Sequence, residues 1–66
     1  MCLVAVYTQP AGSPGRRTLV LSDVAFIECS DDRARVTDLF GRSETLQARV
    51  RFIDTMKNEV VLEQGE

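Results

Sequence analysis

The chain contains no histidine and no tryptophan among its 66 residues. Histidine is the side chain that proteins use most often as a general base and as a metal ligand, so its absence removes the commonest means of both. The sequence also lacks a glycine-rich phosphate-binding motif and a nucleophile beside a base. These absences argue against hydrolytic or group-transfer catalysis, and we expect a protein that is not an enzyme.

Long apolar runs and an excess of basic charge are also lacking. No uninterrupted apolar run approaches the roughly 18 residues of a membrane helix, and residues 1–7 do not resemble a secretory leader. We therefore expect a cytoplasmic protein without a membrane partner. Eight Lys and Arg against ten Asp and Glu give a net charge of -2, which argues against nucleic acid as a partner.

Short runs rich in β-branched residues, separated by turn residues, recur along the chain, and no helical period is sustained. The predicted strands are residues 2–8, 17–21, 24–29, 33–38, 45–53 and 59–63. The fifth is either one bent strand or two strands joined by a bulge. The pattern predicts an all-β fold, a small antiparallel β-barrel or rolled sheet of SH3-like or OB-like size. We expect residues 1–66 to form one domain. Chains this short usually need a disulfide, a metal or a partner subunit to stabilise the fold.

Turn-forming residues separate the predicted strands. Residues 9–15 include two Pro and two Gly, so we expect them to form an exposed hairpin loop. Ser22 and Asp23 are expected to end a strand in the same way. The carboxylates of Asp31, Asp32 and Asp38 are interpreted as turn-forming groups, because no base accompanies them that would make a catalytic pair.

The alternation of apolar and polar residues predicts which side chains face the core. Within residues 33–38, Ala34 and Val36 are expected to face inward and the arginines outward. The chain has few aromatic residues, and we expect Phe26, Phe40 and Phe52 to be used in the core. Residues 2–8 are apolar on both faces, which is typical of a strand at the centre of a closed sheet or covered by a partner.

Two cysteines are the only thiols, and therefore the only thiolate metal ligands and thiol redox groups. Cys29 lies in an apolar run, where a free thiol usually behaves as a small buried hydrophobe. A disulfide between Cys2 and Cys29 would be unusual in a reducing cytosol. Cys2 differs from Cys29 because its thiolate lies close in the chain to the α-amine and to its own amide nitrogen.

Cys2 is a candidate metal ligand for this reason. If Met1 is removed, the amine and the thiolate belong to one residue; if Met1 remains, its amine, the Cys2 amide and the thiolate can surround one ion. Mixed nitrogen and sulfur donors suit Ni(II) or Cu(II) and exclude Mg²⁺ and Ca²⁺. Two copies meeting at a two-fold axis would combine two half-sites. Alternatively, Cys2 is an ordinary residue at the start of a strand, and spacing alone leaves both interpretations open.

Arginines form a second candidate site. Arg33, Arg35, Arg49 and Arg51 occupy the polar positions of two alternating segments, and such a face on a small β-barrel is a hypothetical RNA-binding surface. Arg16, Arg17 and Arg42 extend this set. Single-strand binding usually needs exposed aromatic residues, for which only Tyr7 remains. Acidic residues nearby favour a solvated ladder of ion pairs instead.

Three segments resemble a known family. They are Met1-Cys2-Leu3-Val4, Val36-Thr37-Asp38-Leu39-Phe40-Gly41, and Ile53-Asp54 with Val60-Val61-Leu62-Glu63. In order and spacing the sequence is similar to the CooT family of small nickel-binding proteins. The stretch at residues 9–15 departs from the short first hairpin expected of this family.

The resemblance implies a homodimer of small β-barrel subunits that binds one Ni(II) at the subunit interface through Cys2. It implies that the Met1 and Cys2 main chain supplies the nitrogen ligands, and that the segment from Thr37 to Gly41 serves the fold and dimer packing. Some members deliver nickel to carbon monoxide dehydrogenase. The expected function is therefore that of a metallochaperone or nickel buffer with a client nickel enzyme.

Overall fold

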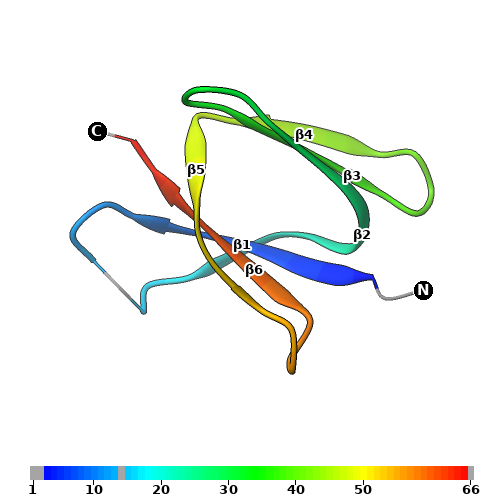
Figure 1. The fold of residues 1–66 in the computed structure, drawn as a ribbon, viewed down its shortest axis with the longest axis horizontal. Coiled ribbons are helices and arrows are strands. Elements are labelled where there is room, and N and C mark those ends of the chain that lie inside the picture. The colour runs from blue at the N-terminus through cyan, green and yellow to red at the C-terminus, as the bar shows by residue number, and fades with distance from the viewer. Residues whose placement is uncertain (1–2, 14, 66) are drawn as a thin grey trace.

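The computed structural model describes residues 3–13 and 15–65, which form six strands and no helix. The strands are β1 (Val4–Pro10), β2 (Thr18–Cys29), β3 (Ala34–Asp38), β4 (Ser43–Leu46), β5 (Ala48–Asp54) and β6 (Glu59–Gln64). They make a single sheet in the order β4-β3-β2-β1-β6-β5, which rolls up on itself (Figure 1). Within the described residues, no helix exists that is long and apolar enough to cross a membrane.

The predicted all-β rolled sheet is confirmed, with one parallel pair in it. The pairs β1–β2, β2–β3, β3–β4 and β5–β6 are antiparallel, whereas β1 and β6 run parallel, with Ala5 opposite Glu59 and Pro10 opposite Gln64. The β5–β6 hairpin thus adds to the edge of β1 that the β1–β2 hairpin leaves free. Alternation within a strand does not encode its direction relative to a distant strand, so the sequence pattern gave no sign of this pair.

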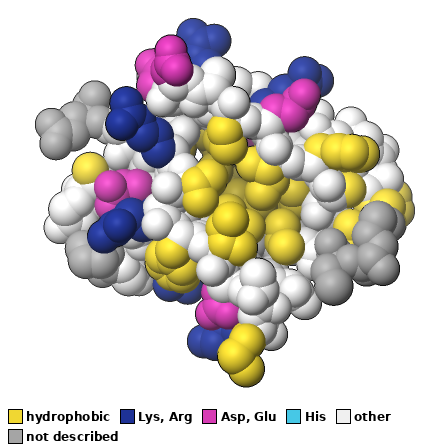
Figure 2. Space-filling model, viewed as in Figure 1, with side chains coloured by type: hydrophobic (Ala, Val, Ile, Leu, Met, Phe, Trp, Pro, Cys, Tyr) yellow, Lys and Arg dark blue, Asp and Glu magenta, His cyan; other side chains and the backbone are white. Residues whose placement is uncertain are grey.

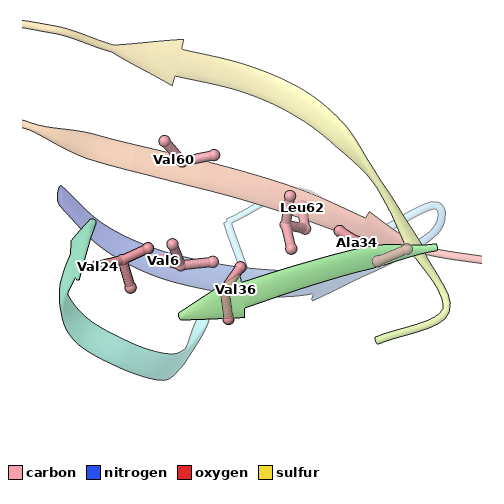
Figure 3. Packing of buried hydrophobic residues seen from close by; sticks show 7 residues of the cluster. Val6, Val24, Ala34, Val36, Val60 and Leu62 are labelled. Carbon is pink, nitrogen blue, oxygen red and sulfur yellow. The ribbon is translucent and has the colours of Figure 1, made fainter. Parts of the chain in front are cut away.

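A core of small aliphatic side chains fills the roll. Its buried cluster consists of Val6, Val24, Ala34, Val36, Ala48, Val60 and Leu62. Figure 3 labels all of these side chains except Ala48, and those labelled converge from β1, β2, β3 and β6. The predicted inward positions of Ala34 and Val36 are confirmed, since both are fully buried. Apolar side chains also gather at the centre of the face seen in Figure 2.

The phenylalanines do not belong to this core, and the prediction that they do was wrong. Phe26, Phe40 and Phe52 are 66%, 74% and 40% exposed. Phe26 is paired with Thr37, and Phe52 is paired with Val61; both pairs lie on the sheet face that points away from the cluster, because successive residues of a strand alternate between faces. The tight roll is instead filled by valine, alanine and leucine.

Strand β2 continues through the position where a turn was predicted. Ser22 and Asp23 both lie inside β2, and Asp23 has a φ of 54°. The pairing registers of β2 with β1 and with β3 both shift near this residue. Aspartate tolerates the left-handed conformation better than most residues. The strand therefore bends at irregular pairings here instead of ending.

Residues 45–53 form parts of two strands that lie at opposite edges of the sheet. β4 pairs only with β3, and β5 pairs only with β6, with Gln47 between them. The bulge that the sequence suggested at the junction is found inside β5, between Val50 and Phe52. Of the two alternatives, the segment is therefore two strands, which separate to opposite edges.

The predicted hairpin loop begins later than residue 9. Strand β1 includes Gln9 and Pro10, and Gln9 is only 3% exposed. Its side-chain Oε1 accepts a hydrogen bond from the Gly15 N–H at 3.4 Å. Gly15 has a φ of 89°, a conformation that glycine adopts without the steric cost paid by other residues. This hydrogen bond thus holds the end of the loop, at Gly15, close to the end of β1.

Candidate metal centre and the adjoining surface

The predicted metal ligands Met1 and Cys2 lie outside the described residues. The described part of the chain begins at Leu3, the residue before β1. Val4, the first residue of β1, is paired with Val24 of β2. The structure therefore defines the surface around the start of β1. In the chain, only Leu3 stands between Cys2 and this strand.

Two turns lie beside the start of β1. The Ala5 N–H donates to the Asn58 carbonyl at 2.9 Å, which holds the β5–β6 turn against β1. The Leu39 N–H donates to the Asp23 carbonyl at 2.9 Å, which holds the β3–β4 turn against β2, next to the residue that pairs with Val4. In Figure 1 the start of β1 and the β3–β4 turn both lie at the right of the molecule.

Asp38 determines the conformation of the β3–β4 turn. Its side chain is buried; Oδ1 accepts from the Phe40 N–H at 2.9 Å and from the Arg42 N–H at 2.8 Å, and Oδ2 accepts from Arg42 Nε at 2.6 Å. Gly41 has a φ of 91°, as a residue of this tight turn requires. The predicted turn-forming role of Asp38 is confirmed, whereas its ion pair with Arg42 was not predicted.

The network around Asp38 makes the stability of the fold depend on pH. Burial raises the pKa of Asp38, but hydrogen bonds from the Arg42 backbone and side chain and from the Phe40 backbone, together with the Arg42 charge, hold it below the ordinary 3.8. The ionised carboxylate therefore stabilises the fold fully above pH 3.8, and this contribution is lost as the pH falls through the lower folded-state pKa.

We expect Asp38→Asn to lower the thermal midpoint at neutral pH by roughly 10 °C, because several hydrogen bonds of a buried group are weakened. The difference from the wild type should shrink as the pH is lowered from about 5 to about 3. Circular dichroism melts at three pH values measure both effects. A constant difference over this range would show that Asp38 does not contribute through its charge.

The locked turn presents apolar side chains to solvent. Leu39 is 51% exposed and Phe40 is 74% exposed, and the exposed Phe26 lies on the outer face of the neighbouring strand β2, opposite Thr37. We call Phe26, Leu39 and Phe40 the turn patch. Exposed apolar groups that gather beside one another mark contact surfaces more often than scattered ones do. Sequence reasoning missed this patch because it assigned the aromatic residues to the core.

The second cysteine is not where the sequence suggested. Cys29 is exposed at the end of β2 and forms no disulfide with any described residue, so the expectation of a buried thiol was wrong. It is the last residue before the turn in which the Ser30 N–H donates to the Arg33 carbonyl at 2.9 Å. Its pairing partner Ala34 is fully buried in the apolar cluster, whereas Cys29 itself is exposed. Across residues 3–13 and 15–65, no three Cys, Asp or Glu side chains gather to hold a metal ion.

The strand arginines of the hypothetical RNA surface lie on strands that are not paired with each other. Arg35 lies in β3 and Arg51 in β5, which are not neighbours in the order of the sheet, although the roll brings the two strands into contact. Arg35 lies 4.0 Å from Glu28, and Arg51 lies 3.6 Å from Glu63. These two arginines fit the solvated ion-pair interpretation, and exposed pairs of this kind contribute little to stability.

The structure thus defines a class of protein: a small all-β protein with a rolled mixed sheet and an exposed apolar turn beside the start of its first strand. The family model of the CO dehydrogenase accessory protein CooT matches residues 1–63. The chain therefore belongs to the CooT family.

A comparison with solved structures supports the fold. The crystal structure of a chain from Carboxydothermus hydrogenoformans assigned to CooT superposes with a TM-score of 0.82, covering 98% of this chain and 100% of that chain. The two sequences are 14% identical, so this likeness shows a shared fold. A comparison with curated proteins found no match.

Proposed function

We propose that this chain is a nickel-binding accessory protein, a metallochaperone or nickel buffer whose client is a nickel enzyme of the carbon monoxide dehydrogenase type. The observation that carries the proposal is the family match, which includes the segment with Cys2. The family is that of an accessory protein of CO dehydrogenase. Nickel is the cargo in this role. A thiolate with main-chain nitrogens is a donor set that suits Ni(II) and not the hard cations Mg²⁺ and Ca²⁺.

A homodimer completes the proposed site. One chain supplies a single Cys2 thiolate and one main-chain nitrogen, of Met1 or of Cys2, which make half of a four-donor site. An isologous dimer places the same residue of both chains at a two-fold axis, so each ion is held by two copies of Cys2. Two subunits would then share one Ni(II).

The surface beside the start of β1 supports this dimer. The turn patch offers roughly 300–400 Å² of apolar side-chain surface, whereas each partner of a standard interface buries about 800 Å². The end of β5 and the β5–β6 turn, on the other side of the start of β1, add Ile53 and Met56, which are 60% and 94% exposed. Exposed apolar groups thus lie on both sides of the start of β1.

Nickel titration followed by native mass spectrometry tests the proposal. We expect one Ni(II) per two chains, with absorbance in the thiolate-to-nickel region. Phe40→Ser should shift the protein toward monomer and weaken nickel binding by about tenfold or more, because exposed aromatic anchors contribute most to such interfaces.

Leu19→Ser is the matched control for Phe40→Ser. Leu19 is 53% exposed near the beginning of β2, away from the turn patch, so this variant should remain a dimer with unchanged nickel affinity. Unchanged circular dichroism would show that both variants fold. Nickel bound at full affinity by a monomer would refute the shared site.

A further inference from the structure

A concave site lies near the other end of β1, where the strand leaves the region beside the candidate metal centre. A pocket of about 290 Å³ is lined by Thr8, Pro10, Arg16, Arg17, Thr18 and Gln64. Its lining residues include two guanidinium groups, two hydroxyls and an amide, and no described carboxylate belongs to the lining. The pocket therefore has the chemistry of an anion site on a chain whose net charge is -2.

The register of the strands places the polar groups on one face. Thr8 of β1 is paired with Thr18 of β2, and Pro10 is paired with Gln64 of β6. Because alternate residues of a strand share a face, these groups continue the inner face that carries Val6 in the core. The apolar interior thus changes into a polar lining at this end of the roll.

Thr8 is the buried member of this lining. It is 7% exposed, and its hydroxyl forms no hydrogen bond with another described residue. Since Thr8 lines the pocket, its remaining accessible surface faces that space. A hydroxyl in this position gains a strong partner when an anion enters, because hydrogen bonds to a charged acceptor are about twice as strong as neutral ones.

The two arginines of the pocket differ in whether their guanidinium groups already have an interaction partner. The Arg17 guanidinium lies 5.0 Å from the centre of the Phe52 ring and 3.5 Å from Glu59 Oε1, so its charge is already compensated. Arg16 forms no ion pair with any described residue, and its backbone N–H donates to the Ser13 carbonyl at 3.3 Å, which fixes the chain at this point. Arg16 is therefore the cation available to an incoming anion.

We propose that this pocket binds a phosphate group, either inorganic phosphate or the phosphate of a small metabolite. Arg16 supplies the charge, the hydroxyls of Thr8 and Thr18 donate hydrogen bonds, and the Gln64 amide adds a further donor. A phosphate presents several acceptor oxygens in a tetrahedral arrangement, which suits separate donors around a pocket better than the two oxygens of a carboxylate. This inference is independent of nickel binding.

Titrations followed by amide-resolved NMR test the phosphate site. The probes are inorganic phosphate, glycerol 3-phosphate and acetate at constant ionic strength. We expect saturable shifts at Thr8, Thr18 and Gln64, with dissociation constants in the range of about 1 mM. Tighter binding of glycerol 3-phosphate would assign the site to a metabolite, whereas tighter binding of inorganic phosphate would assign it to the free ion.

Variants of the pocket decide whether the site is specific. Arg16→Gln and Thr8→Val should each weaken phosphate binding by about tenfold or more, since each removes one donor to a charged group. Arg33→Gln changes the net charge as Arg16→Gln does, but lies outside the pocket, and should bind phosphate like the wild type. Equal weakening by Arg33→Gln, or acetate bound as tightly as phosphate, would overturn the proposal. Arg16 is exposed, so its variant provides the test even if Thr8→Val does not fold.

Discussion

Cys2→Ser is expected to abolish the thiolate-to-nickel absorbance and to weaken Ni(II) binding by at least about 100-fold. Loss of a group that merely orients a ligand already costs 10- to 100-fold in metal affinity, and here the ligand itself is removed. Serine keeps the size of the side chain but replaces a soft thiolate with a neutral hydroxyl, which is a poor ligand for nickel. Isothermal titration and absorbance spectra measure the two effects.

Cys29→Ser provides the matched control for this experiment. It removes the other thiol of the chain by the same chemical change, at an exposed position at the end of β2. We expect its nickel affinity, stoichiometry and spectrum to equal those of the wild type. Full binding by Cys2→Ser, or an equal loss in both variants, would reject the assignment of Cys2 as the nickel ligand.

Leu62→Ala is expected to destabilise the fold more than any other single truncation of the core. Leu62 is fully buried and is among the largest of the fully buried side chains. Replacing a buried leucine by alanine costs about 2–5 kcal/mol, while chains of this size rarely have more than about 3–5 kcal/mol of stability. The variant should therefore be largely unfolded at room temperature, or should melt well below the wild type.

Val50→Ala controls for the truncation at Leu62. Val50 is paired with Leu62 in the β5–β6 ladder but is 39% exposed, so its truncation should cost less than about 1 kcal/mol. Urea unfolding followed by circular dichroism compares the two variants. Equal losses at both positions would mean that stability does not depend on the buried cluster.

The alternating segments of the sequence predicted the local structure well. Residues 33–38 contain β3, with Ala34 and Val36 inside. The turn after β5 was also predicted, and Asp54 stabilises it by accepting hydrogen bonds from the backbone N–H groups of Met56 and Lys57, both at 3.0 Å. These features depend on neighbouring residues only, which is why the sequence pattern contains them.

Features that depend on distant strands were beyond the sequence pattern. Phe26 and Phe52 are apolar, as core residues are, but their strand positions place them on the outer face. Phe52 is partly covered there by the Arg17 guanidinium, 5.0 Å from the centre of its ring, an interaction between residues far apart in the chain. Only the pairing of strands reveals which apolar positions face outward.

The candidate metal centre was predicted from residue type and family resemblance, and Met1 and Cys2 lie outside the described residues. Their role therefore stays a prediction. The surface next to them was predictable only in part, because Asp38 with Gly41 indicated a turn but not the burial of the carboxylate. The ion pair with Arg42 follows from that burial, since a buried carboxylate needs a partner.

The parallel contact between β1 and β6 has a consequence for how the protein is made. β1 belongs to the middle of the sheet, yet its second neighbour comes from residues 59–64, more than fifty positions later in the chain. During translation, the half-assembled sheet must expose one edge of β1 until those residues leave the ribosome. Such distant pairing slows folding and leaves an open edge prone to aggregation. Truncated products that stop before β6 should therefore depend on chaperones or be degraded.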